Sequence, residues 1–250
     1  MSQKMICGRD HNLTSRMPRA WGFVKGRFRA GKWHGIGLTA ALVCFALSIL
    51  SFVAIVYSLS KRGTLFDLDL TINAYLVRVA DPGLPAFLGT LTNLGSIYVV
   101  VMVAVIVGVI LFIRKNRWRL LSLFLAVGIG QAVLNILKVI FQAPRPKTEM
   151  YVFSYSFPSG HVFSATVTYG FCIYLTFRLI NNTTVKWIVS ALLAILILAI
   201  GFSRIYLGVH WLSDTLAGYA TGFAWLLFSI FFAKVVSDRR EKRREKMMSK

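Results

Sequence analysis

Three short polar motifs stand at the ends of apolar stretches, and their residue types suit the chemistry of phosphate esters. The motifs are Lys138 with Arg145-Pro146, Pro158-Ser159-Gly160-His161, and Ser203-Arg204 followed by His210 and Asp214. Charged residues are tolerated at membrane depth only when they pair, line a wet cavity or take part in function. The oxygens of a phosphate ester accept hydrogen bonds from several such donors at once. One phosphate site therefore explains all three motifs.

The first motif combines a polar helical face with a rigid arginine. Gln131, Asn135 and Lys138 are spaced by four and then three residues, so they share one face of a helix. Interhelical hydrogen bonding is the commoner role of Gln131 and Asn135. Arg145 lies between two prolines, and a guanidinium held by a rigid turn suits bidentate contact with phosphoryl oxygens.

The second motif is expected to open a helix. The first turn of a helix presents unpaired N–H groups and partial positive charge, which together attract anions. Gly160 lets the backbone approach a ligand closely. Ser159 taken alone could simply be the N-cap of this helix.

The third motif pairs a histidine with a carboxylate. If the last helix begins near His210, then His210 and Asp214 are four residues apart on one face, and the carboxylate accepts a hydrogen bond from one ring nitrogen. The other nitrogen is then available as a base or nucleophile. A structural ion pair of Asp214 is the alternative.

These motifs must be positioned by membrane helices. Of the residues 56% are hydrophobic and 15% charged, and the mean hydropathy is +0.65, values typical of an integral membrane protein. Because a bilayer core takes roughly 20 helical residues, we expect an all-α bundle of six transmembrane helices. The expected spans are about 37–58, 96–113, 119–140, 161–180, 187–203 and 211–234, and the fifth is the shortest.

The distribution of basic residues predicts the topology. Lys and Arg crowd residues 4–32, 114–119 and 239–250, so both termini should face the cytoplasm. The three motifs then lie on the extracytoplasmic side. We expect a basic N-terminal segment (1–36), the membrane domain (37–235) and a basic tail (236–250). The loop 59–95 is expected to form short interfacial helices broken at Pro82-Gly83, or a packed cap over the bundle.

The net charge of +20 fits cytoplasmic flanks that attract anionic lipids. Nucleic-acid binding is not expected, because the tails lack interleaved aromatic residues and a folded reader module. The three cysteines, Cys7, Cys44 and Cys172, indicate neither disulfides nor a metal cluster. The N-terminal segment has no cleavable signal peptide pattern. The pair Gly218 and Gly222 is expected to allow close helix packing within the chain rather than a contact between copies.

Taken in order, the motifs Lys-x6-Arg-Pro, Pro-Ser-Gly-His and Ser-Arg-x5-His-x3-Asp resemble those of the type 2 phosphatidic acid phosphatase superfamily. All three are intact and cover residues 138–214. The resemblance implies phosphoryl transfer without a metal or other cofactor. His210 would attack phosphorus, Asp214 would orient it, and His161 would protonate the leaving oxygen and then activate water. Lys138, Arg145, Ser159, Gly160 and Arg204 would bind the phosphate.

The resulting hypothesis is a multi-pass plasma membrane enzyme that hydrolyses a lipid phosphate or diphosphate. The family's usual bacterial substrates are undecaprenyl diphosphate, phosphatidylglycerophosphate and phosphatidic acid, and the sequence does not select among them. Two alternatives stay open: a membrane binder or transporter of anions or phospholipids that performs no chemistry, and a lipid phosphotransferase. Membrane lipids are the other expected partners, and the sequence does not predict an oligomeric state.

Overall fold

The computed structural model describes residues 36–79, 83–146 and 155–248, which fold into helices with no strand among them. The chain separates into two compact units, Met1–Val43 and Cys44–Lys250, and the description below concerns the second. The predicted all-α class is confirmed, whereas nearly all of the basic segment 1–36 lies outside the described residues.

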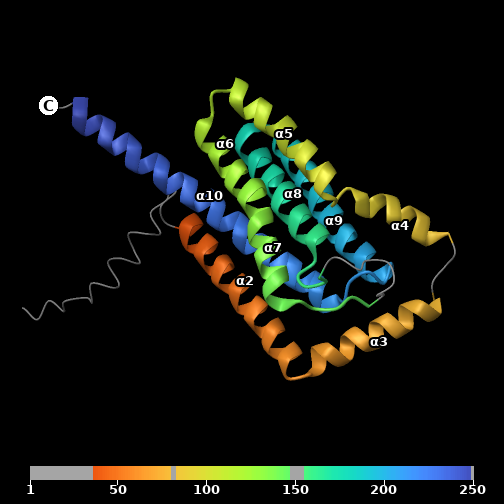
Figure 1. The fold of residues 1–250 in the computed structure, drawn as a ribbon. Helices are drawn as coiled ribbons and strands as arrows, with labels where there is room; N and C mark the ends of the chain where they lie inside the picture. Colours follow the sequence, from red (N-terminus) through yellow and green to blue (C-terminus); the bar gives the residue numbers. More distant parts are fainter. Residues whose placement is uncertain (1–35, 80–82, 147–154, 249–250) are drawn as a thin grey trace, which may run out of the picture. The chain divides into compact units, whose positions relative to one another are not determined.

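The helices are α2 (Ile36–Ser60), α3 (Thr64–Val79), α4 (Leu84–Asn93), α5 (Ile97–Ile113), α6 (Arg117–Leu123), the π-helix η1 (Phe124–Ile129), α7 (Gly130–Phe141), α8 (Gly160–Leu179), α9 (Thr183–Tyr206) and α10 (Leu212–Met248) (Figure 1).

Five helical stretches among the described residues are long and apolar enough to cross a membrane: Gly37–Ser60, Arg117–Phe141, Gly160–Leu179, Thr183–Tyr206 and Leu212–Arg240. A sixth is reached only if α4 and α5, which meet at a bend of 41°, together form one span. The chain is thus built as a multi-pass membrane protein, while the count of six spans and the assignment of their sides stay predictions.

The fifth expected span is longer than predicted. It was expected over 187–203, as the shortest, but α9 covers Thr183–Tyr206 and has 24 residues. The helix starts early because the side chain of Asn182 caps it, accepting a hydrogen bond from the backbone nitrogen of Val185 at 3.0 Å. The polar residues Thr183 and Thr184 obscured this start in the hydropathy pattern.

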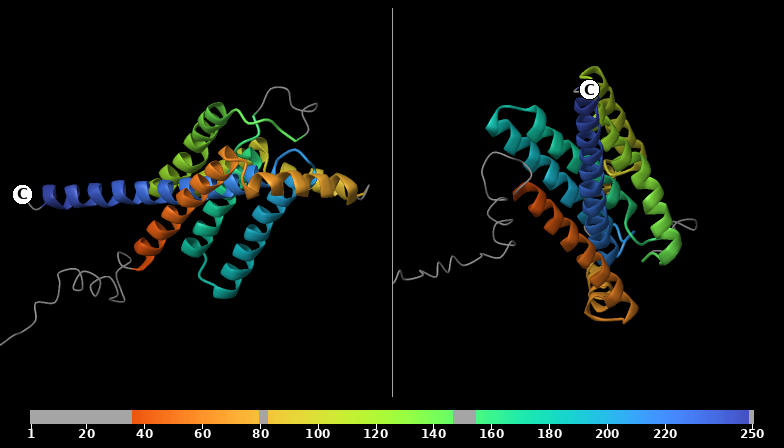
Figure 2. Two further views of the ribbon diagram at one scale, coloured as in Figure 1. Left: turned by 90° about the horizontal axis from the view of Figure 1, so that it is seen from below. Right: turned by 90° about the vertical axis from the view of Figure 1, so that its left-hand side faces the viewer.

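Helix α8 is the most buried of the candidate spans, and it packs against both α9 and α10. Figure 2 shows α8 and α9 side by side and α10 continuing past them towards the C-terminus. Close contact with α10 depends on the predicted glycine pair. A Cβ added at Gly218 would lie 3.0 Å from Ser159 O, and one at Gly222 would lie 3.0 Å from Thr166 Cβ. The pair is therefore an internal contact surface, and it brings the start of α8 against α10.

The span 117–141 contains one turn of π-helix, η1, between α6 and α7. The indole nitrogen of Trp225 on α10 donates to the carbonyl oxygens of Leu125 and Ala126, both at 3.1 Å. The same nitrogen would lie 2.8 Å from a Cβ at Gly130, so the glycine makes room for the indole. These contacts join the middle of this span to α10 and position α7, which carries Lys138.

The loop expected over 59–95 forms two helices, α3 and α4, and the predicted break falls between them, although Pro82 lies outside the described residues. Helix α4 packs against α9, and α3 packs against α10 and α9. Phe87 is 63% exposed on α4, whereas Leu88 next to it is buried. The two helices therefore cover the ends of α9 and α10, and their position at a membrane interface stays a prediction.

Helix α10 begins at Leu212, close to His210 as expected, but His210 itself is not part of the helix. His210 lies in the connection between α9 and α10, and Trp211 takes the N-cap position. The helix then runs unbroken to Met248, without a change of secondary structure at the predicted domain boundary after residue 235.

Candidate active site

His210 and Asp214 meet even though only Asp214 is helical. The ring Nδ1 of His210 lies 3.2 Å from Oδ2 of Asp214, and both side chains are almost fully buried. Asp214 is the third residue of α10, and its Oδ2 also accepts the backbone N–H of Trp211 at 2.9 Å. A carboxylate that reaches back to the N-cap is a common way to start a helix. The hydrogen bond at the start of α10 therefore fixes the carboxylate of Asp214, and this carboxylate positions the imidazole ring of His210.

Ser156 completes this arrangement and was missed by the sequence analysis. Its hydroxyl bonds to Oδ2 of Asp214 and lies 3.2 Å from Nδ1 of His210. The side chain is completely buried, and the backbone nitrogen of Ser156 donates to Ala143 O at 2.9 Å. A serine between the aromatic residues Tyr155 and Phe157, just before the Pro-Ser-Gly-His motif, was the available signal.

The other nitrogen of His210 faces the predicted phosphate-binding arginine. Nη1 of Arg145 lies 3.3 Å from Nε2 of His210 and donates to Val209 O at 3.0 Å. With Nδ1 protonated towards Asp214, the lone pair of Nε2 points at the guanidinium. Nε2 of His210 thus lies beside a cation, an arrangement that could accommodate a phosphoryl group.

Lys138 and Arg145 converge on the same carbonyl group. Nζ of Lys138 donates to Tyr155 O at 2.6 Å, and Nη2 of Arg145 approaches the same oxygen at 3.5 Å. The first motif is therefore folded against the segment that carries Ser156. Of the polar stripe that precedes Lys138, Gln131 donates to Ser164 Oγ at 2.7 Å, which is the interhelical role expected for it.

Arg204 and His161 approach this group from α9 and α8. Arg204 is buried, and its Nη1 donates to Thr92 Oγ1 at 3.4 Å. The backbone carbonyl of Arg204 accepts the N–H of His210 at 3.3 Å. The groups that act electrostatically on His161 are Arg204, His210, Arg145 and Lys138. The three predicted cations and His210 therefore lie within range of electrostatic interaction with His161.

The bend between α4 and α5 also borders the site, which the sequence analysis did not foresee. A Cβ at Gly95 would lie 3.1 Å from His161 O and 2.8 Å from a methyl carbon of Ile200. Gly95 thus allows this bend to approach His161. Thr92, the partner of Arg204, lies in the last turn of α4.

Ser159 and Gly160 occupy the start of α8 as predicted, but Ser159 does not cap the helix through its side chain. Its hydroxyl is fully buried and has no hydrogen-bond partner among the described residues, while its backbone nitrogen donates to Asp214 O at 3.0 Å. A buried hydroxyl without a partner is costly unless a ligand satisfies it. A Cβ at Gly160 would meet Leu134 and Lys138 only at ordinary distances, 3.6 and 3.7 Å. Protein packing alone therefore does not require glycine there.

The electrostatic setting keeps His210 neutral. Burial lowers the pKa of His210 well below its usual value, and Arg204, Arg145 and Lys138 lower it further. A neutral imidazole retains the lone pair that a nucleophile needs.

Asp69 on α3 is a second buried acid at the start of α10. Its Oδ1 accepts the backbone N–H of Ser213 at 2.9 Å, and its Oδ2 accepts the Ser213 hydroxyl at 2.6 Å. Burial raises the pKa of Asp69, while the two bonds from Ser213 oppose this shift. The sequence analysis did not single out Asp69 within the loop 59–95, because nothing in the pattern showed that it would reach α10.

Residues 119–237, which include all three motifs, match the family model described as the PAP2 superfamily. The chain is 28% identical over 206 residues to phosphatidylglycerophosphatase B of Bacillus subtilis (strain 168), covering 80% of this chain and 98% of that protein. It also resembles the crystal structure of a transmembrane PAP2-type phosphatidylglycerolphosphate phosphatase from Bacillus subtilis. The TM-score is 0.64 at 26% identity, covering 80% of this chain and 96% of that one. The resemblance carried by the motifs is thus confirmed by the match of residues 119–237 to the PAP2 superfamily model.

Proposed function

We propose that this protein is a membrane lipid phosphatase that works through a phosphohistidine at His210. The observation that carries the proposal is the environment of the two ring nitrogens of His210. Nδ1 contacts Asp214, and Nε2 faces a cation at 3.3 Å. A phosphoryl group bound by Arg145 would therefore lie next to the lone pair of Nε2.

In the proposed first step, the lone pair of Nε2 attacks phosphorus and the bond to the lipid oxygen breaks. The departing oxygen takes the electron pair and a proton from His161. The negative phosphate beside His161 favours its protonated form. Lys138, Arg145 and Arg204 would stabilise the charge on the equatorial oxygens, as would the hydroxyl of Ser159 and the backbone N–H of Gly160.

In the second step, His161 removes a proton from water, which attacks phosphorus and breaks the bond to Nε2. Inorganic phosphate leaves, and His210 is again neutral. Asp214 stabilises the positive ring between the two steps, because it accepts a hydrogen bond from Nδ1. Each step uses only groups of the chain and water, so we propose that no metal ion is required.

Among lipid phosphates, phosphatidylglycerophosphate is the substrate that we favour, because the curated relative and the similar crystal structure are both named for it. An apolar groove of about 730 Å³ between α2 and α10 also supports a lipid substrate. Its lining includes Leu47 and Ile55 on α2 and Phe223 on α10, and it reaches Leu216, two residues from Asp214. We propose that the site opens on the extracytoplasmic face of the plasma membrane, because basic residues crowd the opposite ends of the spans.

The test is phosphate release by the purified full chain in detergent with a chelator present. Phosphatidylglycerophosphate, undecaprenyl diphosphate and phosphatidic acid would be compared, with wild type and His210→Ala. We expect release that is fastest with phosphatidylglycerophosphate and lost in the variant. A faster rate with another lipid would change the substrate but keep the mechanism.

Three outcomes would overturn the proposal or a part of it. Lipid binding without release, unchanged in His210→Ala, would show a binder or transporter. Transfer of labelled phosphate to an acceptor lipid in place of water would show a phosphotransferase. Loss of release on chelation, restored by added metal, would reject the metal-independent mechanism.

A further inference from the structure

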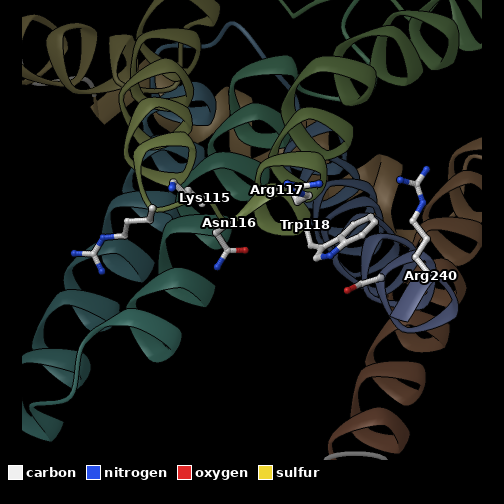
Figure 3. Close-up of a pocket in the computed structure, with 7 residues that line it drawn as sticks. Lys115, Asn116, Arg117, Trp118 and Arg240 are labelled. Atoms are coloured by element: carbon white, nitrogen blue, oxygen red, sulfur yellow. The ribbon is translucent and has the colours of Figure 1, made fainter. Parts of the chain in front are cut away.

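A basic pocket lies between the α5–α6 turn and α10 (Figure 3). It encloses about 780 Å³, and its lining includes four cations, Arg114, Lys115, Arg117 and Arg240, together with Trp118. The described residues that line it include no acid. Clustered cations repel one another unless an anion is bound among them, so the pocket is suited to an anionic ligand.

The pocket is distinct from the candidate active site. Arg117 begins the span that ends at Phe141, and Lys138 lies near the far end of that span. A helix of that length separates the two residues by about 30 Å. The pocket therefore lies at the opposite end of the membrane-spanning helices from His210.

Every cation of the pocket lies where an apolar span ends. Arg114 directly follows the apolar helix α5, Arg117 is the first residue of α6, and Arg240 is the last residue of the candidate span Leu212–Arg240. This is the depth at which lipid headgroups lie. Trp118 also fits this depth, because tryptophan is enriched at membrane interfaces.

The turn that carries the pocket has an unusual backbone conformation and an unfavourable placement of charge. Lys115 adopts a left-handed conformation with φ of 54°, at the turn where Asn116 N donates to Leu111 O at 2.9 Å. Glycine is the usual residue at such a helix end. Arg117 and Arg119 lie in the first turn of α6, where the helix dipole disfavours positive charge. A bound anion would offset the unfavourable position of these charges.

The two sides of the pocket are joined by a cation–π contact between Arg240 and Trp118. The guanidinium carbon of Arg240 lies 5.5 Å from the centre of the Trp118 ring, and Figure 3 shows Arg240 reaching from α10 beside the indole. Such a contact holds the guanidinium in place while its N–H groups stay able to bind an anion. The pocket is thus formed by two separate elements.

We propose that this pocket binds the phosphate headgroup of an anionic membrane lipid, at the membrane face opposite the active site. The phosphodiester would lie among the four cations, and the acyl chains would continue along the apolar ends of α5 and α10. A lipid accounts for the depth of the cations and for Trp118, whereas free phosphate accounts only for the charge.

The test is photolabelling of the full chain in phosphatidylcholine vesicles doped with photoreactive phosphatidylglycerol that carries its label at the headgroup. Wild type would be compared with the double variant Lys115→Gln/Arg240→Gln. The matched control is Arg178→Gln/Lys186→Gln, which removes two charges at the α8–α9 connection. We expect labelled peptides from 114–118 and 237–240, with labelling reduced roughly 10- to 30-fold in the double variant and unchanged in the control.

Three results would overturn the proposal. The first is equal labelling of these peptides in both variants. The second is equal labelling by photoreactive phosphatidylcholine, which would indicate a surface without charge selectivity. The third is loss of labelling in excess inorganic phosphate but not in chloride of equal ionic strength, which would indicate a site for free anions. Unchanged phosphate release by the double variant would verify that it is folded, whatever the labelling shows.

Discussion

Asp69 on α3 holds the start of α10 by accepting two hydrogen bonds from Ser213. The backbone N–H of Ser213 donates to Oδ1 at 2.9 Å, and its hydroxyl donates to Oδ2 at 2.6 Å. Ser213 precedes Asp214, so the carboxylate that orients His210 stands on a helix end that a distant helix fixes. This contact joins the first loop of the membrane domain to the proposed nucleophile.

We expect Asp69→Ala to lower kcat roughly 10- to 100-fold with little change in KM, because small displacements of reacting groups are enough for such losses. The backbone N–H and the hydroxyl of Ser213 would lose their acceptor, which should also cost about 1–3 kcal/mol of stability. Asp67→Ala is the control, because Asp67 is exposed on the same helix. Phosphate release and thermal unfolding would be measured, and equal kcat in the two variants would rule out the positioning role.

Gly160 and Gly218 allow steric and catalytic effects to be separated. A Cβ at Gly160 has ordinary contacts, whereas one at Gly218 would lie 3.0 Å from both Ser159 O and Val162 Cβ. Gly160→Ala should fold normally and release phosphate about 10- to 100-fold more slowly, because the methyl group keeps phosphate from the backbone. Gly218→Ala should lose about 1–3 kcal/mol of stability.

Thermal unfolding and initial rates would be recorded for both glycine variants. A Gly160→Ala protein that unfolds early would show that the glycine serves packing. Full activity in the same variant would show that phosphate does not approach the start of α8.

The proposed double role of His161 predicts different effects on the two chemical steps. An aryl phosphate has a good leaving group and needs little help from an acid, so His161→Asn should still be phosphorylated by it. Hydrolysis of the phosphohistidine should then be about 10²- to 10⁴-fold slower, because water lacks its base. Labelled protein that is stable in base and labile in acid should accumulate. The control His161→Asn/His210→Ala should carry no label, and label in this double variant would place the nucleophile elsewhere.

The lowered pKa of His210 predicts a stability that depends on pH. Unfolded, the imidazole takes up a proton below about pH 6.5, whereas burial keeps it neutral in the folded protein. Stability should therefore be constant above that pH and fall as the pH drops towards the folded pKa, by up to about 1.4 kcal/mol per pH unit. His210→Gln lacks this proton uptake, and Asp69 affects both proteins alike.

The measurement is the difference in melting temperature between wild type and His210→Gln, taken at about pH 7.5 and about pH 5. Wild type should lose stability relative to the variant at the lower pH. A constant difference would contradict a buried neutral His210.

The sequence by itself determined the helical membrane class, the motifs and the residue types of the site. Hydropathy over roughly 20 residues is a local property, so it can be read without a structure. The spacing of His210 and Asp214 correctly predicted that the two side chains meet, but only Asp214 lies on the helix, so they do not share a helical face. The pair meets across a helix cap, with His210 outside α10, and local sequence patterns leave such boundaries uncertain by one or two residues.

Tertiary structure alone decided which distant groups complete the site. Ser156 reaches Asp214, Thr92 reaches Arg204 and Asp69 reaches Ser213, and these pairs are separated by 58, 112 and 144 residues. Helical or strand periodicity in the sequence cannot predict these pairs, because the residues come together only when the helices pack around α8. Sequence spacing reports neighbours on one helix, while contacts between helices depend on how glycine surfaces and bulky side chains fit, which is a property of the whole bundle.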